Sequence, residues 1–111
     1  MTVRTAAEKL ALRIICGDGE REICGVYAGD LLSWVMSHLT DGEAWITIMS
    51  NVNVVAVASL TGAAAVILAE GVEPDPPALE AARERGITLL SGDMPVYELC
   101  AAMSSVIGES A

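Results

Sequence analysis

The feature that most constrains this chain is a stretch without charge, because residues 44–69 contain no Asp, Glu, Lys or Arg. The stretch is long enough to cross a bilayer as a helix. Glu43 and Glu70 flank it, so no Lys or Arg is in place to orient it in a membrane. Polar residues also interrupt it, namely Ser50, Asn51, Asn53 and Thr61. The stretch therefore predicts a strand, a helix and a second strand, all buried in an α/β core.

Composition bounds the size of this fold and the partners it can take. The chain has 111 residues, 53% of them hydrophobic, and no Phe, so we expect one compact domain with an aliphatic core. We assign residues 1–107 to this domain and residues 108–111 to a frayed C-terminal tail. The formal net charge of −9 excludes a nucleic-acid binder, which needs a cationic surface, and disfavours docking on anionic lipid.

The N-terminal residues and the cysteines indicate a cytoplasmic protein. Residues 1–13 lack the apolar core of a signal peptide. Cys16, Cys24 and Cys100 are odd in number, and no pair has the Cys-x-x-Cys spacing, so we expect them to be small buried hydrophobic side chains. Because His38 is the only histidine, the sequence predicts no metal site, and it predicts no cofactor.

Hydrophobic periodicity and turn residues predict an alternating order of helices and strands. Helices are expected at residues 3–10, 31–39, 52–60, 78–85 and 95 to about 106. Strands are expected at residues 12–16, 22–28, 44–49, 64–69 and 87–90. Side chains suited to cap the helix starts are Thr2, Asp30, Asn51 (or Ser50) and Asp75. This order predicts an α/β fold with an open, largely parallel sheet of about five strands and helices on both faces.

Parallel strands end at a common edge of such a sheet, and open α/β folds bind ligands at that edge. The loops after the strands supply these candidate ligand-binding residues: Asp30, Thr47, Ser50, Asn51, Asn53, Glu70, Gly71, Ser91 and Asp93. Asp30 also suits a helix cap, which is the favoured role, although one carboxylate can serve both. Residues 50–53 suit a turn with a cap better than an anion site, because the glycines and lysine of a P-loop are absent.

The positions of the charges constrain the ligand further. Between Glu22 and Ala82 the chain has no Lys or Arg, so ATP would find no cation in the central loops. An uncharged or cationic small ligand fits this edge better, and a nucleoside held by backbone donors stays open.

The sequence predicts no catalytic residues. His38 falls late in an amphipathic helix, and pairs such as Asp30 with Glu70 or Asp93 occur in any acidic α/β domain. Trp34 and Trp45 are expected in the core or at a subunit interface.

Several runs of the sequence resemble small DRTGG-domain proteins, and together they cover nearly the whole chain. They are residues 22–33 (EICGVYAGDLLS), 44–48 (AWITI), 53–60 (NVVAVASL), 65–68 (AVIL) and 86–91 (GITLLS), with Gly71, Pro74 and Asp75. The five-letter motif that names the family is absent, so no role of that motif is carried over.

This resemblance implies a fold similar to the N-terminal domain of HPr kinase/phosphorylase and, more distantly, to the UDP-binding N-terminal domain of Mur ligases. Stand-alone members are often encoded beside iron-only hydrogenase or redox operons in anaerobes, and other members lie within pyrophosphatases that carry CBS domains. Across these settings the domain is regulatory or structural, with no established catalytic residues.

Two functions follow as hypotheses. The first is a non-catalytic regulatory or protein-interaction domain that senses a small metabolite, linked to anaerobic redox or hydrogenase systems, with a redox enzyme or a regulatory protein as partner. The alternative is a nucleotide- or UDP-like ligand-binding domain with phosphate chemistry. In both cases we expect a homo-oligomer, with a dimer favoured, because a domain this small often gains stability by association.

Overall fold

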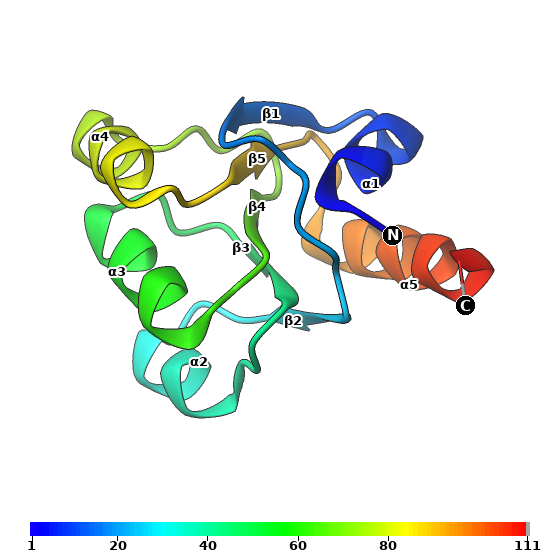
Figure 1. Cartoon of the computed structure of the whole chain (residues 1–111), viewed down its shortest axis with the longest axis horizontal. Helices are drawn as coiled ribbons and strands as arrows, with labels where there is room; N and C mark the ends of the chain where they lie inside the picture. Colours follow the sequence, from blue (N-terminus) through cyan, green and yellow to red (C-terminus); the bar gives the residue numbers. More distant parts are fainter. Residues whose placement is uncertain (111) are drawn as a thin grey trace.

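The computed structural model describes the chain through Ser110, and its side chains through Gly108 (Figure 1). The helices are α1 (Val3–Leu10), α2 (Leu32–His38), α3 (Val52–Thr61), α4 (Pro76–Arg85) and α5 (Val96–Ser110). The strands are β1 (Arg13–Cys16), β2 (Gly25–Ala28), β3 (Glu43–Thr47), β4 (Ala65–Leu68) and β5 (Leu89–Ser91). The order of elements along the chain is the predicted one.

The strands form one five-stranded sheet in the order β1-β5-β4-β3-β2. The strands β2, β3, β4 and β5 run parallel to one another, whereas β1 pairs antiparallel with β5. The predicted fold class, an open and largely parallel sheet with helices on both faces, is therefore confirmed. Figure 1 shows α2, α3 and α4 on one side of the sheet and α1 and α5 on the other.

Two apolar clusters fill the space between the sheet and its two helix layers. One cluster lies under α1 and α5 and contains Ile46, Leu90 and Met103, and the other lies under α2, α3 and α4 and contains Trp45 and Val66. The uncharged stretch of the sequence supplies β3, α3 and β4, and every residue of β4 is buried. The interpretation of this stretch as strand, helix and strand is correct, and no described helix is long and apolar enough to cross a membrane.

Two of the predicted caps form the expected side-chain hydrogen bond, Asp75 holds the N-cap position of α4 without that bond, and the cap predicted at Asp30 is wrong. The Thr2 side chain accepts a hydrogen bond from the N–H of Thr5, and the Asn51 side chain accepts one from the N–H of Asn53. Asp30 does not cap α2, which begins after Leu31 with no side-chain cap. Asp75 precedes α4 but makes no capping hydrogen bond either. Both carboxylates instead bind partners from another loop.

Some element ends differ from the prediction because of contacts with distant residues. Residues 22–24 do not extend β2; instead Glu22 bridges to Thr2, and the N–H of Ile23 donates to the carbonyl of Met1. The helix α5 continues to Ser110, beyond its predicted end near residue 106, and it includes residues 108–110 of the predicted frayed tail. Residue 111 lies outside the described residues.

The cysteines also depart from the expected burial, whereas the two tryptophans fall in the two environments expected for them, the core and the surface open to a partner. Cys24 is exposed, and Cys16 and Cys100 are half-buried, so the expectation that all three are buried is wrong. Burial raises the pKa of the Cys100 thiol above its usual value. Trp45 is fully buried, whereas Trp34 on α2 is 57% exposed, because Val35 is the one described residue of α2 that is buried.

Candidate functional site

The carboxyl ends of β2, β3, β4 and β5 meet at the same edge of the sheet, because these four strands are parallel. The candidate residues follow these ends in the chain: Asp30 after β2, Thr47 to Asn53 at β3, Glu70 and Gly71 after β4, and Ser91 and Asp93 at β5. Their contacts divide them into three groups along this edge, in the order of the strands.

The first group joins Asp30 to the end of β3. The Thr47 hydroxyl donates to Asp30 Oδ1 at 2.6 Å, and the N–H of Ile48 donates to the same oxygen at 3.1 Å. Thr47 is fully buried, and its Oγ1 also accepts from the N–H of Met49 at 3.2 Å. These bonds hold the Asp30 carboxylate through Oδ1, and no hydrogen bond to Oδ2 is formed among the described residues.

A shallow depression of about 410 Å³ lies beside Asp30. Its lining includes Tyr27 and Gly29 from the end of β2 and Leu31 and Trp34 from the start of α2. The Trp34 ring stacks on His38 at a centroid distance of 4.4 Å and an angle of 17°. The depression thus combines an oriented carboxylate with two aromatic side chains, an arrangement suited to a planar ring that carries hydrogen-bond donors.

Sequence reasoning did not include Tyr27 and Trp34 among the site residues. Trp34 was expected in the core or at an interface, and Tyr27 was interpreted only as part of the bulk of a strand. The signal available in the sequence was the short spacing of Tyr27, Asp30 and Trp34 across the junction between β2 and α2. That junction brings all three to one depression.

The second group, at the start of α3, is occupied with internal contacts. The Ser50 hydroxyl donates to Asp75 Oδ1 at 3.0 Å, and the N–H of Asp75 donates to the Ser50 carbonyl at 2.9 Å. Asn51 Oδ1 accepts from the N–H of Asn53 at 2.9 Å. These bonds explain why the Asp75 side chain makes no capping hydrogen bond to α4. The two bonds between Ser50 and Asp75, called the clasp below, join the loop before α3 to the loop before α4.

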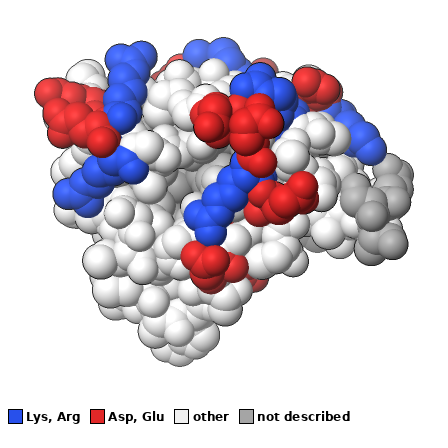
Figure 2. Space-filling view, viewed as in Figure 1, with Lys and Arg blue, Asp and Glu red and all other residues white. Residues whose placement is uncertain are grey.

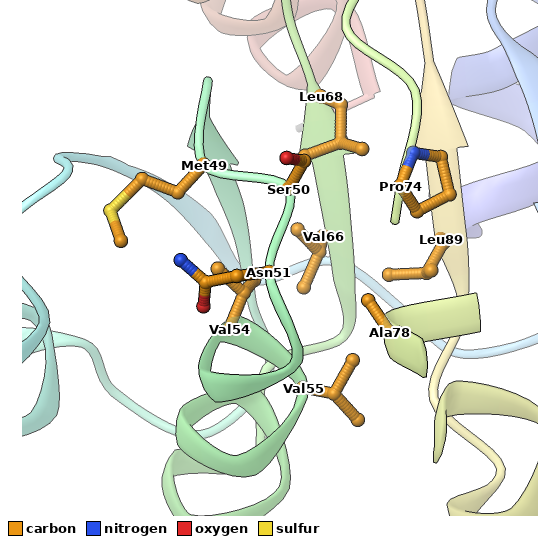
Figure 3. Close-up of a pocket in the computed structure, with 10 residues that line it drawn as sticks. All are labelled: Met49, Ser50, Asn51, Val54, Val55, Val66, Leu68, Pro74, Ala78 and Leu89. Carbon is orange, nitrogen blue, oxygen red and sulfur yellow. The ribbon is translucent and has the colours of Figure 1, made fainter. Parts of the chain in front are cut away.

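The cavity beneath this clasp is too small for a metabolite. Its volume is about 10 Å³, which is about the space of a single water. Figure 3 shows the apolar side chains that surround it, contributed by α3, β4, β5 and the start of α4, namely Val54, Val55, Val66, Leu68, Pro74, Ala78 and Leu89.

The third group lies at the end of β5 and includes a cation from β1. Arg13 forms an ion pair with Glu73 and donates to Ser91 Oγ at 3.0 Å. The hydrogen bond from Arg13 lowers the pKa of the Glu73 carboxyl, and a hydrogen bond from Ser91 adds to that effect. With Gly71 and Asp93 these residues line a polar depression of about 160 Å³.

The backbone of the third group is tied together by the loops after β4 and β5. The N–H of Glu70 donates to the Met94 carbonyl, and the N–H of Gly71 donates to the Gly92 carbonyl, both at 2.9 Å. Glu70 adopts a φ of 58°, a left-handed conformation that is uncommon for a residue other than glycine. The edge therefore carries an Asp30 group and an Arg13 group, separated by β3 and β4.

The described residues contain no cluster of three or more His, Cys, Asp or Glu side chains able to hold a metal ion. His38 Nδ1 lies 2.8 Å from the Trp34 carbonyl and 2.9 Å from Ser37 Oγ, within its own helix.

The fold and the strand-end site define an α/β domain of the open, largely parallel type. No family model matches the sequence, and a search of curated proteins finds no match. Among solved structures, the chain is similar to the CBS and DRTGG domains of the regulatory region of Clostridium perfringens pyrophosphatase, complexed with the activator diadenosine tetraphosphate. The TM-score is 0.71 at 12% identity, over 91% of this chain and 45% of the other. This chain therefore spans less than half of that chain, and the likeness supports a DRTGG-like fold.

Proposed function

We propose that this chain is a DRTGG-like, non-catalytic regulatory domain that binds a small uncharged or cationic ligand beside Asp30. The observation that carries the proposal is the Asp30 carboxylate, which Thr47 and Ile48 hold through Oδ1, whereas no described residue donates to Oδ2. A carboxylate that is already oriented loses little freedom when a ligand donor binds it. The depression next to it offers the rings of Tyr27 and Trp34 as apolar walls.

The regulatory part of the proposal is supported by the fold. The similar structure is a regulatory region solved with a nucleotide activator, and the match covers 91% of this chain and 45% of the other. Fold similarity at 12% identity transfers neither a ligand nor a binding site. The choice of ligand class for this chain therefore depends on its own side chains.

The charge around Asp30 favours a ligand without phosphate groups. None of the residues that line the depression is Lys or Arg. Arg13 lies on β1, at the opposite end of the sheet from β2. A polyphosphate beside Asp30 would meet a carboxylate with no cation to offset it, whereas an amine or an N–H donor would gain a charge-assisted hydrogen bond.

The non-catalytic part of the proposal is supported by the position of the single histidine. His38 is exposed and stacked on Trp34, and the hydroxyl beside its Nδ1 is that of the preceding residue in the chain, Ser37, at 2.9 Å. The Ser37 hydroxyl also bonds to the Trp34 carbonyl, and neither residue lines the depression beside Asp30, so this contact is typical of a helix surface. A redox-enzyme partner, a link to anaerobic hydrogenase systems, a cytoplasmic location and the single-domain boundary at residue 107 stay predictions from the sequence.

The test is a binding screen in which the two halves of the edge are compared. Adenosine, spermidine, UDP and ATP are added to the protein, and the shift in Tm and the fluorescence of Trp34 are followed. Trp34 is exposed and Trp45 is buried, so a ligand in the depression changes the Trp34 emission selectively. The Asp30→Asn variant is expected to lose about tenfold in affinity for adenosine or spermidine, the loss of one charge-assisted hydrogen bond.

The Asp93→Asn variant is the matched control, because it makes the same change of charge at the other end of the edge. It is expected to bind as the wild type does. Equal loss in both variants, or no shift with any of the probes, would contradict the proposed site. Hydrolysis of UDP or ATP by the wild type but not by Asp30→Asn would instead establish the nucleotide alternative with phosphate chemistry.

The nucleotide alternative has a different location in this fold. Arg13, Ser91, Gly71 and Asp93 line the depression of about 160 Å³ at the end of β5. Arg13 is already paired with Glu73, so a phosphate bound there would have to displace that carboxylate. UDP binding that is lost in Arg13→Gln but kept in Asp30→Asn would place a nucleotide at this second location.

A further inference from the structure

The sheet has two outer strands, β1 and β2, each with a neighbour on one side only. An outer strand carries peptide N–H and C=O groups that point away from the sheet, and such groups pair readily with another chain. Natural proteins therefore protect these edges with charged residues, prolines, bulges or covering segments.

The two edges of this sheet differ in their protection. Along β1 the register is irregular between Ile14 and Cys16, and Arg13 places a charge that is tied to Glu73. The strand β2, Gly25–Ala28, contains no charged residue and no proline, and its register with β3 is continuous. Of the two edges, β2 is the one left open to another strand.

The peptide groups on the open side of β2 belong to alternate residues. The N–H of Cys24 donates to the Gly42 carbonyl at 3.0 Å, on the side of β3. Because successive residues of a strand direct their peptide groups to opposite edges, the N–H and C=O groups of Gly25 and Tyr27 face the open side.

Depressions border β2 on both faces of the sheet. On the α5 face a depression of about 350 Å³ is lined by Val26, Ala28, Cys100, Ser104 and Ile107. On the α2 face the depression of about 410 Å³ includes Tyr27 and Trp34. An added strand projects its side chains alternately to the two faces, so the α5-side depression leaves room for the side chains that a strand paired with β2 directs to that face. The α2-side depression remains the proposed ligand site beside Asp30.

We propose that β2 pairs antiparallel with β2 of a second copy of this chain, so that the two sheets become continuous across a two-fold axis at Val26. This register sets Gly25 of each copy opposite Tyr27 of the other, and their outward peptide groups form the hydrogen bonds of the seam. The residue without a side chain faces the largest side chain of the strand, so the strand is complementary to itself.

The low charge beside β2 lets a second copy of this acidic chain approach this edge. Two chains that each carry −9 repel one another wherever carboxylates meet. The residues that line the α5-side depression carry no charge. On the other face α2 has no Asp, Glu, Lys or Arg, and the depression there carries one charged residue, Asp30. Figure 2 shows the same contrast on its visible face, where the charged side chains lie over other elements and the surface over α2 and α3 is white. Glu22, beyond the start of β2, is paired with the N-terminal ammonium.

The experiment measures mass in solution by sedimentation equilibrium. The wild type is expected at twice the chain mass of 11.5 kDa. Ala28→Lys places a charge at an exposed position of the seam and is expected to weaken the dimer at least tenfold. Leu60→Lys is the matched control, because Leu60 is 74% exposed on α3, away from β2, and this variant is expected to stay a dimer.

A second variant tests the backbone bonds without adding charge. Gly25→Pro removes an N–H on the open side, and a Cβ at this position meets Glu43 Oε2 at an ordinary contact distance of 3.4 Å. This variant is expected to be monomeric with an unchanged far-UV CD spectrum. Hydrogen exchange adds a residue-level readout, because the amides of Gly25 and Tyr27 are expected to exchange faster in Ala28→Lys than in the wild type.

The proposal is overturned by a wild type that remains monomeric up to millimolar concentration. It is equally overturned by a dimer that persists in folded Ala28→Lys and Gly25→Pro but dissociates in Leu60→Lys, since that result places the contact on the α3 side. These outcomes do not depend on any ligand, so they are separate from the test of the Asp30 site.

Discussion

Thr47 is the residue on which the geometry of the candidate site depends. It is fully buried at the end of β3, and its hydroxyl both donates to Asp30 and accepts from the N–H of Met49. Because the Thr47 hydroxyl is buried and has two hydrogen-bond partners, it holds the exposed Asp30 carboxylate in a fixed orientation. Asp30 therefore owes its orientation to a neighbouring strand rather than to the helix that follows it.

Replacing Thr47 by Val tests this role, because the two side chains have similar shape and only the hydroxyl is lost. The change leaves the N–H of Met49 without its acceptor and Asp30 without one donor. We expect unfolding free energy to fall by about 1–2 kcal/mol, measured by urea denaturation.

Thr61→Val is the control for this prediction. The Thr61 hydroxyl donates to the Val57 carbonyl within α3, and the helix does not depend on that bond. Its loss is expected to cost less than about 0.5 kcal/mol. Equal losses in the two variants would show that Thr47 has no special part in the packing of this edge.

The sequence alone could locate this edge but not the partners of its side chains. Asp30 and Asp75 both precede helices, and the local pattern predicts caps at both positions. Thr47 and Ser50 instead donate to them from a loop that is distant in the sequence. Tertiary hydrogen bonds of this kind leave no periodic signal, and for the same reason the pairing of Arg13 with Glu73 was not predicted.

At the scale of elements, the alternation of helices and strands was readable because each strand is a short apolar run between turn residues. The position and direction of β1 in the sheet could not be predicted from the sequence. The strand pairs antiparallel with β5, at the opposite end of the sheet from β2, its successor in the chain. Strands that follow one another in the chain are often neighbours in the sheet, so β2 would be the expected neighbour of β1. The segment between β1 and β2 instead pairs with the N-terminus, through the bridge between Glu22 and Thr2.

Gly17 fixes the close approach between the end of β1 and β5, and it provides a test of this element pair. Its φ is 94°, and an added Cβ would lie 2.7 Å from the Cα of Thr88. Gly17→Ala therefore combines left-handed strain with a clash against backbone, and we expect it to lower the unfolding free energy by roughly 3 kcal/mol or more.

Gly86→Ala separates the two causes. Gly86 ends α4 with a φ of 69°, and an added Cβ there meets no atom within 4 Å. Only the backbone strain remains, so we expect a loss of about 1–2 kcal/mol by the same urea measurement. A loss at Gly17 no larger than that at Gly86 would mean that β1 moves away from β5 at little cost.

At the scale of the whole molecule, charge and apolar surface are kept apart. The exposed large apolar side chains are concentrated on α2, α3 and the loop before α3, where they include Leu31, Trp34, Met36, Val52 and Leu60. The ion pairs of Met1, Arg4 and Arg13 lie elsewhere, at α1, β1 and the loops that face them. The ion pair of Arg21 with Asp41 lies at the C-terminal end of α3. Because the exposed apolar side chains and most of the ion pairs lie on different elements, this acidic chain has a surface of low charge that a partner can contact.

This division gives the proposed dimer a distinctive dependence on salt. Each copy carries −9, so at low ionic strength the two copies repel over distances well beyond the seam. Salt shortens the screening length from about 30 Å at 0.01 M to about 10 Å at 0.1 M, whereas backbone hydrogen bonds at an uncharged seam are not weakened. The dissociation constant is therefore expected to fall as NaCl rises from about 0.01 to about 0.1 M.

Sedimentation equilibrium at these two salt concentrations measures the effect, and a dimer held by ion pairs would show the opposite trend. Glu84→Gln is a useful companion, because Glu84 is exposed on α4, away from β2, and no ion pair involves it among the described residues. Removing its charge is expected to tighten the dimer at the lower salt concentration and to have less effect at the higher one. A dimer that weakens as salt is added would show that charged side chains, and not the strand β2, form the contact.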